Sequence, residues 1–170
     1  MDKIEIEQKA NELREASGIE DIFPTPFDAI FRHIGYLYGI IEKKHLKKNP
    51  GYSNISCWLD RSKKIIGVNF SEARQKRYFQ MAHQIGHLLL HTDAESESEV
   101  KIDYRESKNS VFTDKPPKER EANYFAACLL MPASEFKKQH LILRKNPFLI
   151  GDYFDVSFAS VEIRTYYLKL

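Results

Sequence analysis

The spacing of apolar residues predicts two helices in the first part of the chain. Over residues 2–16 the apolar side chains recur at roughly helical steps among charged neighbours, and they are Ile4, Ala10, Leu13 and Ala16. Gly18 follows and ends this segment. After the break at Pro24-Thr25-Pro26, a shorter helix is expected from Phe27 to Ile34, because its apolar stripe stops before Gly35.

Short strands are predicted between residues 35 and 70. Residues that are β-branched or aromatic are concentrated in segments 36–41 and 64–70, and less densely in 56–59. Asn49-Pro50-Gly51 supplies a turn between the first of these segments and the others. We therefore expect a small antiparallel sheet in this region.

Residues 71–91 carry the helix with the most informative pattern. Ser71 is expected to cap it, because a serine side chain can accept a hydrogen bond from the first turn. At ~100° per residue, one stripe of this helix holds the apolar residues Tyr78, Met81, Ala82, Ile85 and Leu89. Three histidines, His83, His87 and His91, fall on the opposite side. We expect them to face a cleft that another part of the chain closes.

The rest of the chain is predicted to be a polar connection followed by helices. Residues 92–115 show little periodicity, apart from a short strand pattern near Ser110 to Thr113. A helix over residues 117–131 starts at a proline pair and stops at Met131-Pro132. Residues 134–170 contain further helical segments, one opening at Asn146-Pro147 and the last at Ser157, and we expect them to form a helical cap.

The composition fits a single domain and narrows the classes of function. A chain of 170 residues with 42% hydrophobic residues can bury a core of its own, so we expect one domain over residues 1–170. The 26 basic and 24 acidic residues nearly cancel, which argues against direct nucleic-acid binding. The acidic start and the lack of a long apolar run predict neither a classical signal peptide nor a membrane span. Cys57 and Cys128 are too few for a disulfide framework and suit a reducing cytoplasm.

Two histidines one helical turn apart form a candidate metal site. His83 and His87 can reach the same ion from one face of a helix, as in the zinc-protease pattern His-Glu-x-x-His. His91 lies eight residues from His83, and the rise of ~12 Å along a helix is too long for a shared ion. We expect His91 to orient a ligand or to line the cleft.

The helix over residues 117–131 offers the third ligand. Glu119 lies on the edge of its inward-facing stripe, whereas Glu121 projects roughly 160° away, toward water. A carboxylate on an inward stripe must be paired or bind a metal to offset its desolvation, so Glu119 is the preferred ligand. Asn123, one turn further on, is placed to hydrogen-bond a ligand histidine and fix its ring.

These motifs resemble those of the ImmA/IrrE family of metallo-endopeptidases. The resemblance rests on Val68-Asn69, Arg77-Tyr78-Phe79, the run Ala82–His91 and the run Glu119–Pro132. It implies an α+β, mostly helical fold of the zincin or gluzincin type, with the metal site between the two helices. It implies that a Zn²⁺ ion is bound by His83, His87 and Glu119. It also implies a cytoplasmic enzyme whose protein substrate is a helix-turn-helix repressor, often one that controls a mobile element or a stress response.

Gln84 departs from the family pattern, which has a glutamate at this position. In such sites the glutamate takes a proton from water and passes it to the leaving amine, and an amide cannot do so. Metal binding should survive, but this form is expected to be inactive or strongly impaired. Two explanations stay open: a natural pseudopeptidase that binds a repressor or senses a signal, and a substitution introduced into an active enzyme. The otherwise intact site favours the second.

Several further features of the sequence do not have one assigned function. A tyrosine or histidine is expected to stabilise the oxyanion, and the sequence does not choose among the candidate tyrosines Tyr78, Tyr104 and Tyr124. Residues 154–163 weakly resemble a helix-turn-helix motif. They lack its glycine-containing turn and basic face, which argues against DNA binding there. Taken without the second motif, the three histidines could be polar residues of a half-buried helix. The oligomeric state is not encoded in any motif.

Overall fold

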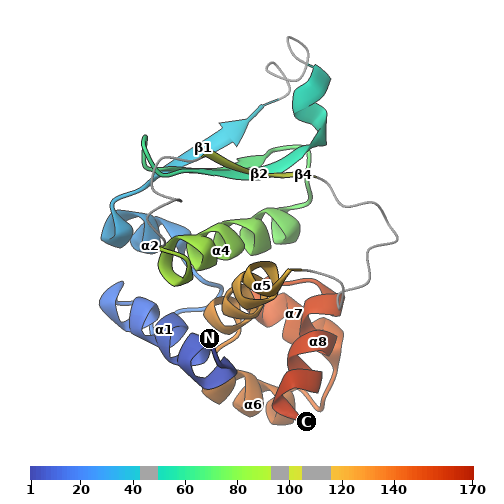
Figure 1. Cartoon of the computed structure of the whole chain (residues 1–170). Helices are drawn as coiled ribbons and strands as arrows, with labels where there is room; N and C mark the ends of the chain where they lie inside the picture. The colour runs from blue at the N-terminus through green and yellow to red at the C-terminus, as the bar shows by residue number, and fades with distance from the viewer. Residues whose placement is uncertain (43–49, 93–99, 105–115) are drawn as a thin grey trace.

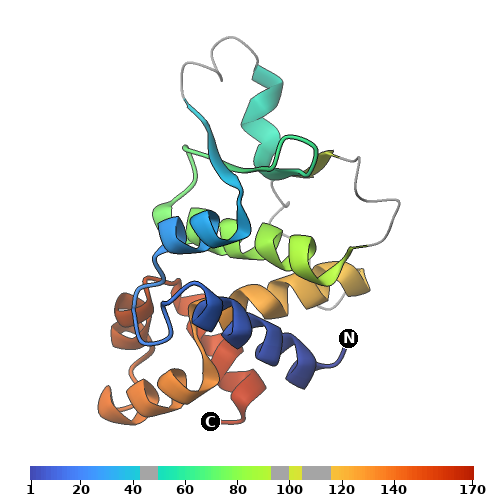
Figure 2. The ribbon, with the colours of Figure 1, turned by 90° about the vertical axis from the view of Figure 1, so that its left-hand side faces the viewer.

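The computed structural model describes residues 1–42, 50–92, 100–104 and 116–170, and it has the expected α+β architecture. A small sheet lies at one end of the molecule, helix α4 runs beneath it, and most of the other helices lie below α4 (Figures 1 and 2). The buried core runs through these layers, with members from α1 to α8. No helix in the described ranges is long and apolar enough to cross a membrane.

The sheet has four strands in the order β1-β3-β2-β4. Their bounds are Leu37–Ile41 for β1, Ile55–Asp60 for β2, Ile65–Asn69 for β3 and Val100–Tyr104 for β4. Strand β2 is antiparallel to both β3 and β4, but β1 is parallel to β3, so the expectation of a purely antiparallel sheet is wrong. The reason lies in the order of the strands. Strand β3 follows β2 as a hairpin and lies between β1 and β2, and both β1 and β3 run opposite to β2.

Strand β4 falls within the segment that was expected to be a polar connection. Its residues alternate, with Val100, Ile102 and Tyr104 exposed and Lys101 and Asp103 half-buried. This two-residue period is a strand signal, but it is only five residues long and two of its members are charged. The strand pattern near residues 110–113 lies outside the described residues. Because β4 is at the end of the strand order, it forms an edge of the sheet as far as the described residues go.

The first two helices follow the predicted bounds closely. Helix α1 spans Lys3–Ala16 and begins with a capping box between Asp2 and Glu5. Helix α2 spans Phe27–Ile34 and ends at Gly35, whose φ of 69° is the left-handed conformation that glycine adopts at low cost.

The inward face of α1 differs from the predicted one. Ile6, Ala10, Leu13 and Arg14 are buried, whereas Ile4 is 80% exposed and Ala16 is also exposed. Arg14, one of the charged neighbours of the predicted stripe, is buried, and its guanidinium donates to carbonyl groups in the turn after the helix, including that of Ile19 at 2.6 Å. The inward face therefore includes a hydrogen-bonded arginine and excludes Ile4 and Ala16.

Helix α4 spans Arg74–Leu90 and packs against strands β2 and β3 on one side and helix α5 on the other. Its predicted apolar stripe is inward: Met81, Ala82 and Ile85 are buried, and Tyr78 and Leu89 pack partly against the core. The predicted cap is wrong, because the helix begins after Ala73 without a side-chain cap. Ser71 instead bonds the side chain of Asn69 through its backbone N–H and its hydroxyl.

Helix α5 spans Pro117–Leu130 and crosses α4 at Gly86. A Cβ added at Gly86 would lie 3.1 Å from the Cα and 3.2 Å from the carbonyl oxygen of Ala122. Contacts this short leave no room for a side chain between the two backbones. The small residues at this crossing therefore let α5 approach the histidine face of α4, and Glu119 lies three residues before Ala122.

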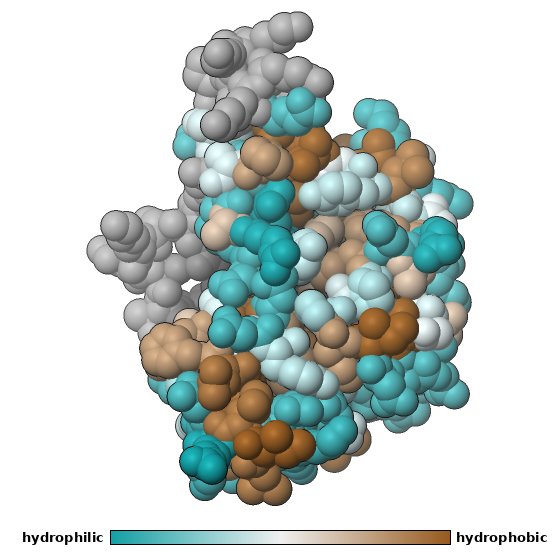
Figure 3. Space-filling model, turned by 180° about the vertical axis from the view of Figure 1, so that it is seen from behind, coloured by the Kyte–Doolittle hydropathy of each residue, from teal (hydrophilic) through white to brown (hydrophobic). Residues whose placement is uncertain are grey.

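Three further helices complete the lower end of the molecule, as the sequence predicted. They are α6 at Ala133–Ile142, α7 at Pro147–Phe154 and α8 at Phe158–Leu168. The side chains of Asn146 and Ser157 cap α7 and α8. Figure 3 shows apolar surface at this end of the molecule. The exposed large hydrophobic residues of this part of the chain include Leu141, Ile142, Phe148, Leu149 and Phe158.

Candidate metal centre

The centre is built on two histidines of α4 that share one face of the helix. His83 and His87 are both buried, and their Nε2 atoms lie 3.1 Å apart. Two imidazole nitrogens this close can share only one proton between them. Their lone pairs therefore converge on a position where a cation would be bound favourably.

Glu119, in the first turn of α5, completes this group. Its Oε2 atom lies 3.3 Å from His83 Nε2, and its Oε1 atom lies 3.2 Å from His87 Nε2. The donor atoms of these three residues all lie within 4.8 Å of one another. Ligands at about 2.0–2.1 Å from a tetrahedral zinc ion are separated by about 3.3 Å, so both the donor types and their spacing fit zinc.

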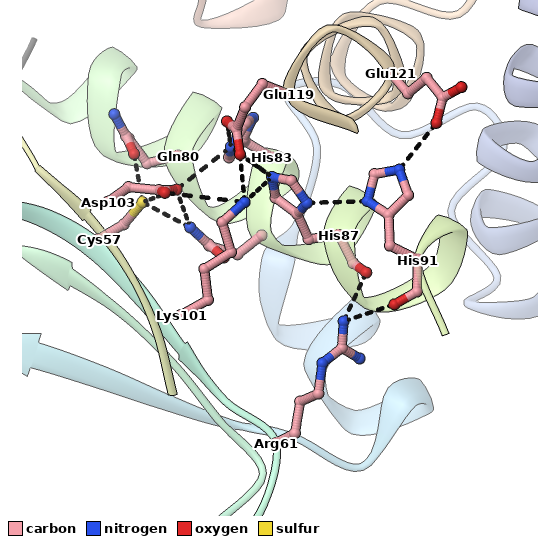
Figure 4. Close-up of polar contacts among 11 residues, drawn as sticks. Cys57, Arg61, Gln80, His83, His87, His91, Lys101, Asp103, Glu119 and Glu121 are labelled. Atoms are coloured by element: carbon pink, nitrogen blue, oxygen red, sulfur yellow. Dashed lines mark hydrogen bonds and ion pairs between the residues drawn. The ribbon is translucent and has the colours of Figure 1, made fainter. Parts of the chain in front are cut away.

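His91 is not one of the three converging residues and contacts the far side of the His87 ring. Its Nδ1 atom is 3.0 Å from His87 Nδ1, and its Nε2 atom is 2.9 Å from Glu121 Oε2. Glu121 is therefore not directed toward water as expected, because α5 crosses α4 closely enough for the carboxylate to reach His91. Arg61 holds the same end of α4 by donating to the carbonyl oxygens of His87 and His91 (Figure 4).

Asn123 does not make the hydrogen bond that the sequence suggested. It is buried, but its Nδ2 atom bonds no described residue, and neither does His83 Nδ1. His87 Nδ1 faces His91 instead. The outer partner of His87 is thus another histidine, and Asn123 presents its amide to the cleft beside His83 and Glu119.

Gln84 is completely buried and turns toward the sheet. Its Nε2 atom donates to Cys57 Sγ at 3.0 Å and to Asp103 Oδ2, while its Oε1 atom has no partner among the described residues. Burial raises the pKa of the Cys57 thiol well above its usual value, so Cys57 is neutral and can donate to Gln80. The amide at position 84 is thus held by strands β2 and β4.

Strand β4 adds two charged residues that sequence patterns did not point to. Asp103 Oδ2 lies 3.4 Å from His83 Nε2. Lys101 Nζ lies 2.5 Å from His87 Nε2 and forms an ion pair with Glu119 (Figure 4). The only signal for them is their alternation with apolar residues, because their place beside the histidines depends on pairing between β4 and β2.

Comparisons with known proteins agree with this arrangement. The family described as Peptidase M78, IrrE N-terminal-like domain, matches residues 41–166, which is more than half of the chain. The chain belongs to this family. As a member of the M78 peptidases, it is a metallopeptidase-like protein, and the matched range contains His83, His87 and Glu119.

A solved structure shares the fold of this M78 family member. It is a Mycobacterium tuberculosis transcriptional regulator with a TM-score of 0.63 and 18% sequence identity, and the match covers 93% of this chain. The chain spans 45% of the length of that protein, so the likeness concerns the fold of one part of it. No curated protein sequence matches the chain.

The two histidines of this M78 site differ in protonation, because burial disfavours a charged His83 but its hydrogen bonds to Asp103 and Glu119 outweigh burial and raise its pKa. Burial lowers the pKa of His87 to about 4, and the charges of His83 and Lys101 lower it too, so this imidazole is neutral near pH 7. Burial alone would raise the pKa of Glu119, but hydrogen bonds from His83, His87 and Lys101 hold it well below its usual value. The pKa of Asp103 is also lowered, because His83 and Lys101 outweigh the effect of burial. Both carboxylates are therefore ionised.

A cleft of about 660 Å³ opens beside the centre, between α4, β4, α5 and α8. Of the three candidate tyrosines, Tyr104 and Tyr124 line this cleft, and burial raises the pKa of Tyr124 to about 12. Tyr78 is not among the lining residues and packs against Phe27, with ring centroids 5.3 Å apart. The site of this M78 protein thus combines a charged cluster with an adjoining cleft.

Proposed function

We propose that the chain is a zinc-dependent endopeptidase that cleaves a helix-turn-helix transcriptional repressor. The observation that carries the proposal is the convergence of one oxygen and two nitrogen donors, from Glu119, His83 and His87, at the spacing of zinc ligands. Membership of a metallopeptidase family supports the same chemistry.

In this proposal His83, His87 and Glu119 hold the ion, and His91 orients His87 by bonding its far nitrogen. Bound zinc supplies Lewis-acid polarisation of the scissile carbonyl and a lowered pKa for water. Among the described strands β4 lies at an edge of the sheet, and it borders the cleft, so an extended substrate segment can pair with it. Gln84 occupies the position of the usual general base but cannot accept a proton, so cleavage is inactive or strongly impaired unless another side chain takes the proton.

The choice of a repressor as substrate rests on resemblance. The sequence motifs are similar to those of the ImmA/IrrE metallo-endopeptidases, and the solved protein of similar fold is a transcriptional regulator. The net charge of +2 on 170 residues supports a protein rather than a nucleic acid as the direct partner. We place the reaction in the cytoplasm, where such repressors act.

The proposal is tested by metal binding and by cleavage. The purified protein should bind one zinc ion per chain, and a His87→Ala variant should lose this binding. Candidate helix-turn-helix repressors should then be incubated with the zinc-loaded protein and analysed for fragments by mass spectrometry. Fragments that appear with zinc and are absent with His87→Ala support the proposal. Absence of zinc binding in the wild type would contradict it.

A second candidate is a non-catalytic protein that uses this fold to bind a repressor or sense a signal. The observation that favours it is the ammonium of Lys101, which already contacts His87 Nε2 and Glu119. Lys101 is one-third exposed, so it can also swing away when an ion arrives. A Lys101→Met variant separates the two candidates. An endopeptidase should bind zinc with and without Lys101, whereas a site that uses Lys101 as its own cation should bind zinc only in the variant.

A further inference from the structure

The general base missing from position 84 has a counterpart on the neighbouring strand. Gln84 directs its amide nitrogen at Asp103 Oδ2, and the same oxygen lies 3.4 Å from His83 Nε2. Figure 4 shows Asp103 and Cys57 together on one side of His83. A carboxylate thus stands beside the predicted zinc ligands, although it comes from β4 instead of α4.

We propose that Asp103 is the general base of this site and that Gln84 is the residue that positions it. The inference rests on the proposed peptidase function and names the residue that carries its proton transfer. Asp103 lines the same cleft as His83 and Glu119, so it can reach a substrate bound there. It is not one of the three residues whose donor atoms converge, which leaves it beside the ion rather than bound to it.

The chemistry of the pair explains why position 84 holds an amide. Gln84 is fully buried and its side chain reaches Asp103, so a glutamate there would set two carboxylates against each other in a buried place. An amide instead donates a hydrogen bond to the carboxylate and holds it in one orientation. The site therefore keeps one carboxylate and one amide, with the carboxylate on β4 and the amide at position 84.

The hydrolytic step can be written with Asp103 alone as the proton carrier. Asp103 takes a proton from water while the water oxygen forms a bond to the scissile carbonyl carbon and the C=O π electrons move onto the carbonyl oxygen. The C=O bond then re-forms, the C–N bond breaks, and Asp103 returns its proton to the leaving nitrogen. One water is consumed, and a carboxylic acid and an amine are released.

The test compares Asp103→Asn with the exchanged double variant Gln84→Glu/Asp103→Asn, and it does not depend on the substrate. Its probe is acetohydroxamic acid, a small zinc chelator whose hydroxyl proton needs an acceptor beside the metal. Zinc affinity and acetohydroxamate affinity are both measured by calorimetry on zinc-loaded protein. Asp60→Asn is the matched control, since Asp60 bonds Ser62 and Lys63 at the end of β2 and does not line the cleft.

We expect Asp103→Asn to bind zinc like the wild type but to bind acetohydroxamate about ten- to hundredfold more weakly, because a charged hydrogen-bond acceptor is lost. The double variant should recover most of this affinity, and Asp60→Asn should lose none. With a repressor that the wild type cuts, Asp103→Asn should be slower by ~10²- to 10⁴-fold.

Each contrary result has a separate meaning. Unchanged acetohydroxamate affinity in Asp103→Asn would overturn the role of Asp103 while leaving the zinc site in place. A loss of zinc affinity of more than about 100-fold would instead make Asp103 a ligand. If Asp103→Asn does not fold, the double variant decides: it keeps one carboxylate and one amide, and failure to bind acetohydroxamate would overturn the inference. Absence of zinc from the wild type would remove the proposed function itself.

Discussion

Two buried polar clusters lie in different parts of the molecule and differ in how completely their polar atoms are hydrogen-bonded. One surrounds Arg164 of α8 at the lower end, and the other surrounds His83 and His87 below the sheet. Both place charged groups among buried residues. They differ in whether each polar atom has a partner, and this difference separates a group that stabilises the fold from a group that can carry chemistry.

Every nitrogen of the Arg164 guanidinium has an acceptor. Its Nε atom donates to the carbonyl oxygen of Met131 at 2.9 Å, Nη1 donates to Cys128 Sγ at 3.3 Å, and Nη2 is paired with Glu7. Glu7 also accepts from the backbone of Ala133. The cluster thus joins α1, α5 and α8 and leaves no nitrogen of the Arg164 guanidinium without a partner, as expected of a structural group.

The cluster under the sheet contains polar atoms without hydrogen-bond partners, and it places two imidazole nitrogens against each other. His83 Nδ1, Gln84 Oε1 and Asn123 Nδ2 are buried and bond no described residue. The two Nε2 atoms that face each other, with Lys101 and two carboxylates around them, form an arrangement that hydrogen bonds alone do not satisfy. Such incomplete pairing is typical of a site completed by a ligand.

The largest predicted effect breaks the satisfied cluster. Arg164→Met should lower the free energy of unfolding by about 3–5 kcal/mol, because it leaves the Glu7 carboxylate without its partner in a largely buried place. Urea unfolding monitored by circular dichroism measures this change. Adding Glu7→Gln to the variant should restore part of the loss, and the zinc affinity of the folded protein should stay constant. A destabilisation below about 1 kcal/mol would show that the pair is not structural.

Local signals explain how much of the fold was predictable. The caps at Gly35, Asn146 and Ser157 depend on neighbouring residues only, so the helix ends beside them were predicted well. The inward face of α1 was less predictable, because burying Arg14 requires carbonyl groups from the following turn and from the end of α5. The direction of β1 beside β3 likewise depends on the order of strands, which no local pattern contains.

The residues of the candidate centre likewise include some that the sequence predicted and some that it did not. His83 and His87 are one helical turn apart, so helical geometry pairs them, and the inward stripe of α5 selects Glu119 as the candidate carboxylate. The packing of α5 against α4 then brings Glu119 to the two histidines. Asp103 and Lys101 were missed because they reach the centre through the pairing of β4 with β2, across more than 40 residues of chain. Residues brought to a site by strand pairing carry only the two-residue alternation as a local signal.

The second prediction breaks the incomplete cluster. Glu119→Gln should reduce zinc affinity by more than about 100-fold, because it removes the one anionic ligand. The free energy of unfolding of the metal-free protein should change by less than about 1 kcal/mol, because the Glu119 side chain is partly exposed. Competition with a chromogenic chelator measures the affinity, and urea unfolding measures the stability. A large loss of stability without zinc would place this cluster in the same class as that of Arg164.

The third prediction concerns the close crossing that holds the incomplete cluster together. Gly86→Ala places a Cβ against the backbone of Ala122, and the resulting overpacking should cost about 1–3 kcal/mol, partly offset by the better helix propensity of alanine. Because α5 must shift, Glu119 should move from the histidines and zinc affinity should fall. Thermal unfolding and zinc titration of the same samples test both effects. Unchanged zinc affinity would mean that Glu119 does not depend on this crossing.

The smallest predicted effect tests the outer partner of the incomplete cluster. His91→Phe keeps a ring of similar size but removes the nitrogens that face His87 Nδ1 and Glu121. Loss of such a partner typically costs 10- to 100-fold in metal affinity, and we expect about tenfold here because His87 keeps its place on the helix. Glu121→Gln is the matched change one step further from the ion and should have a smaller effect. If His91→Phe binds zinc as the wild type does, His91 only lines the site, and the chain of partners behind His87 contributes nothing to metal binding.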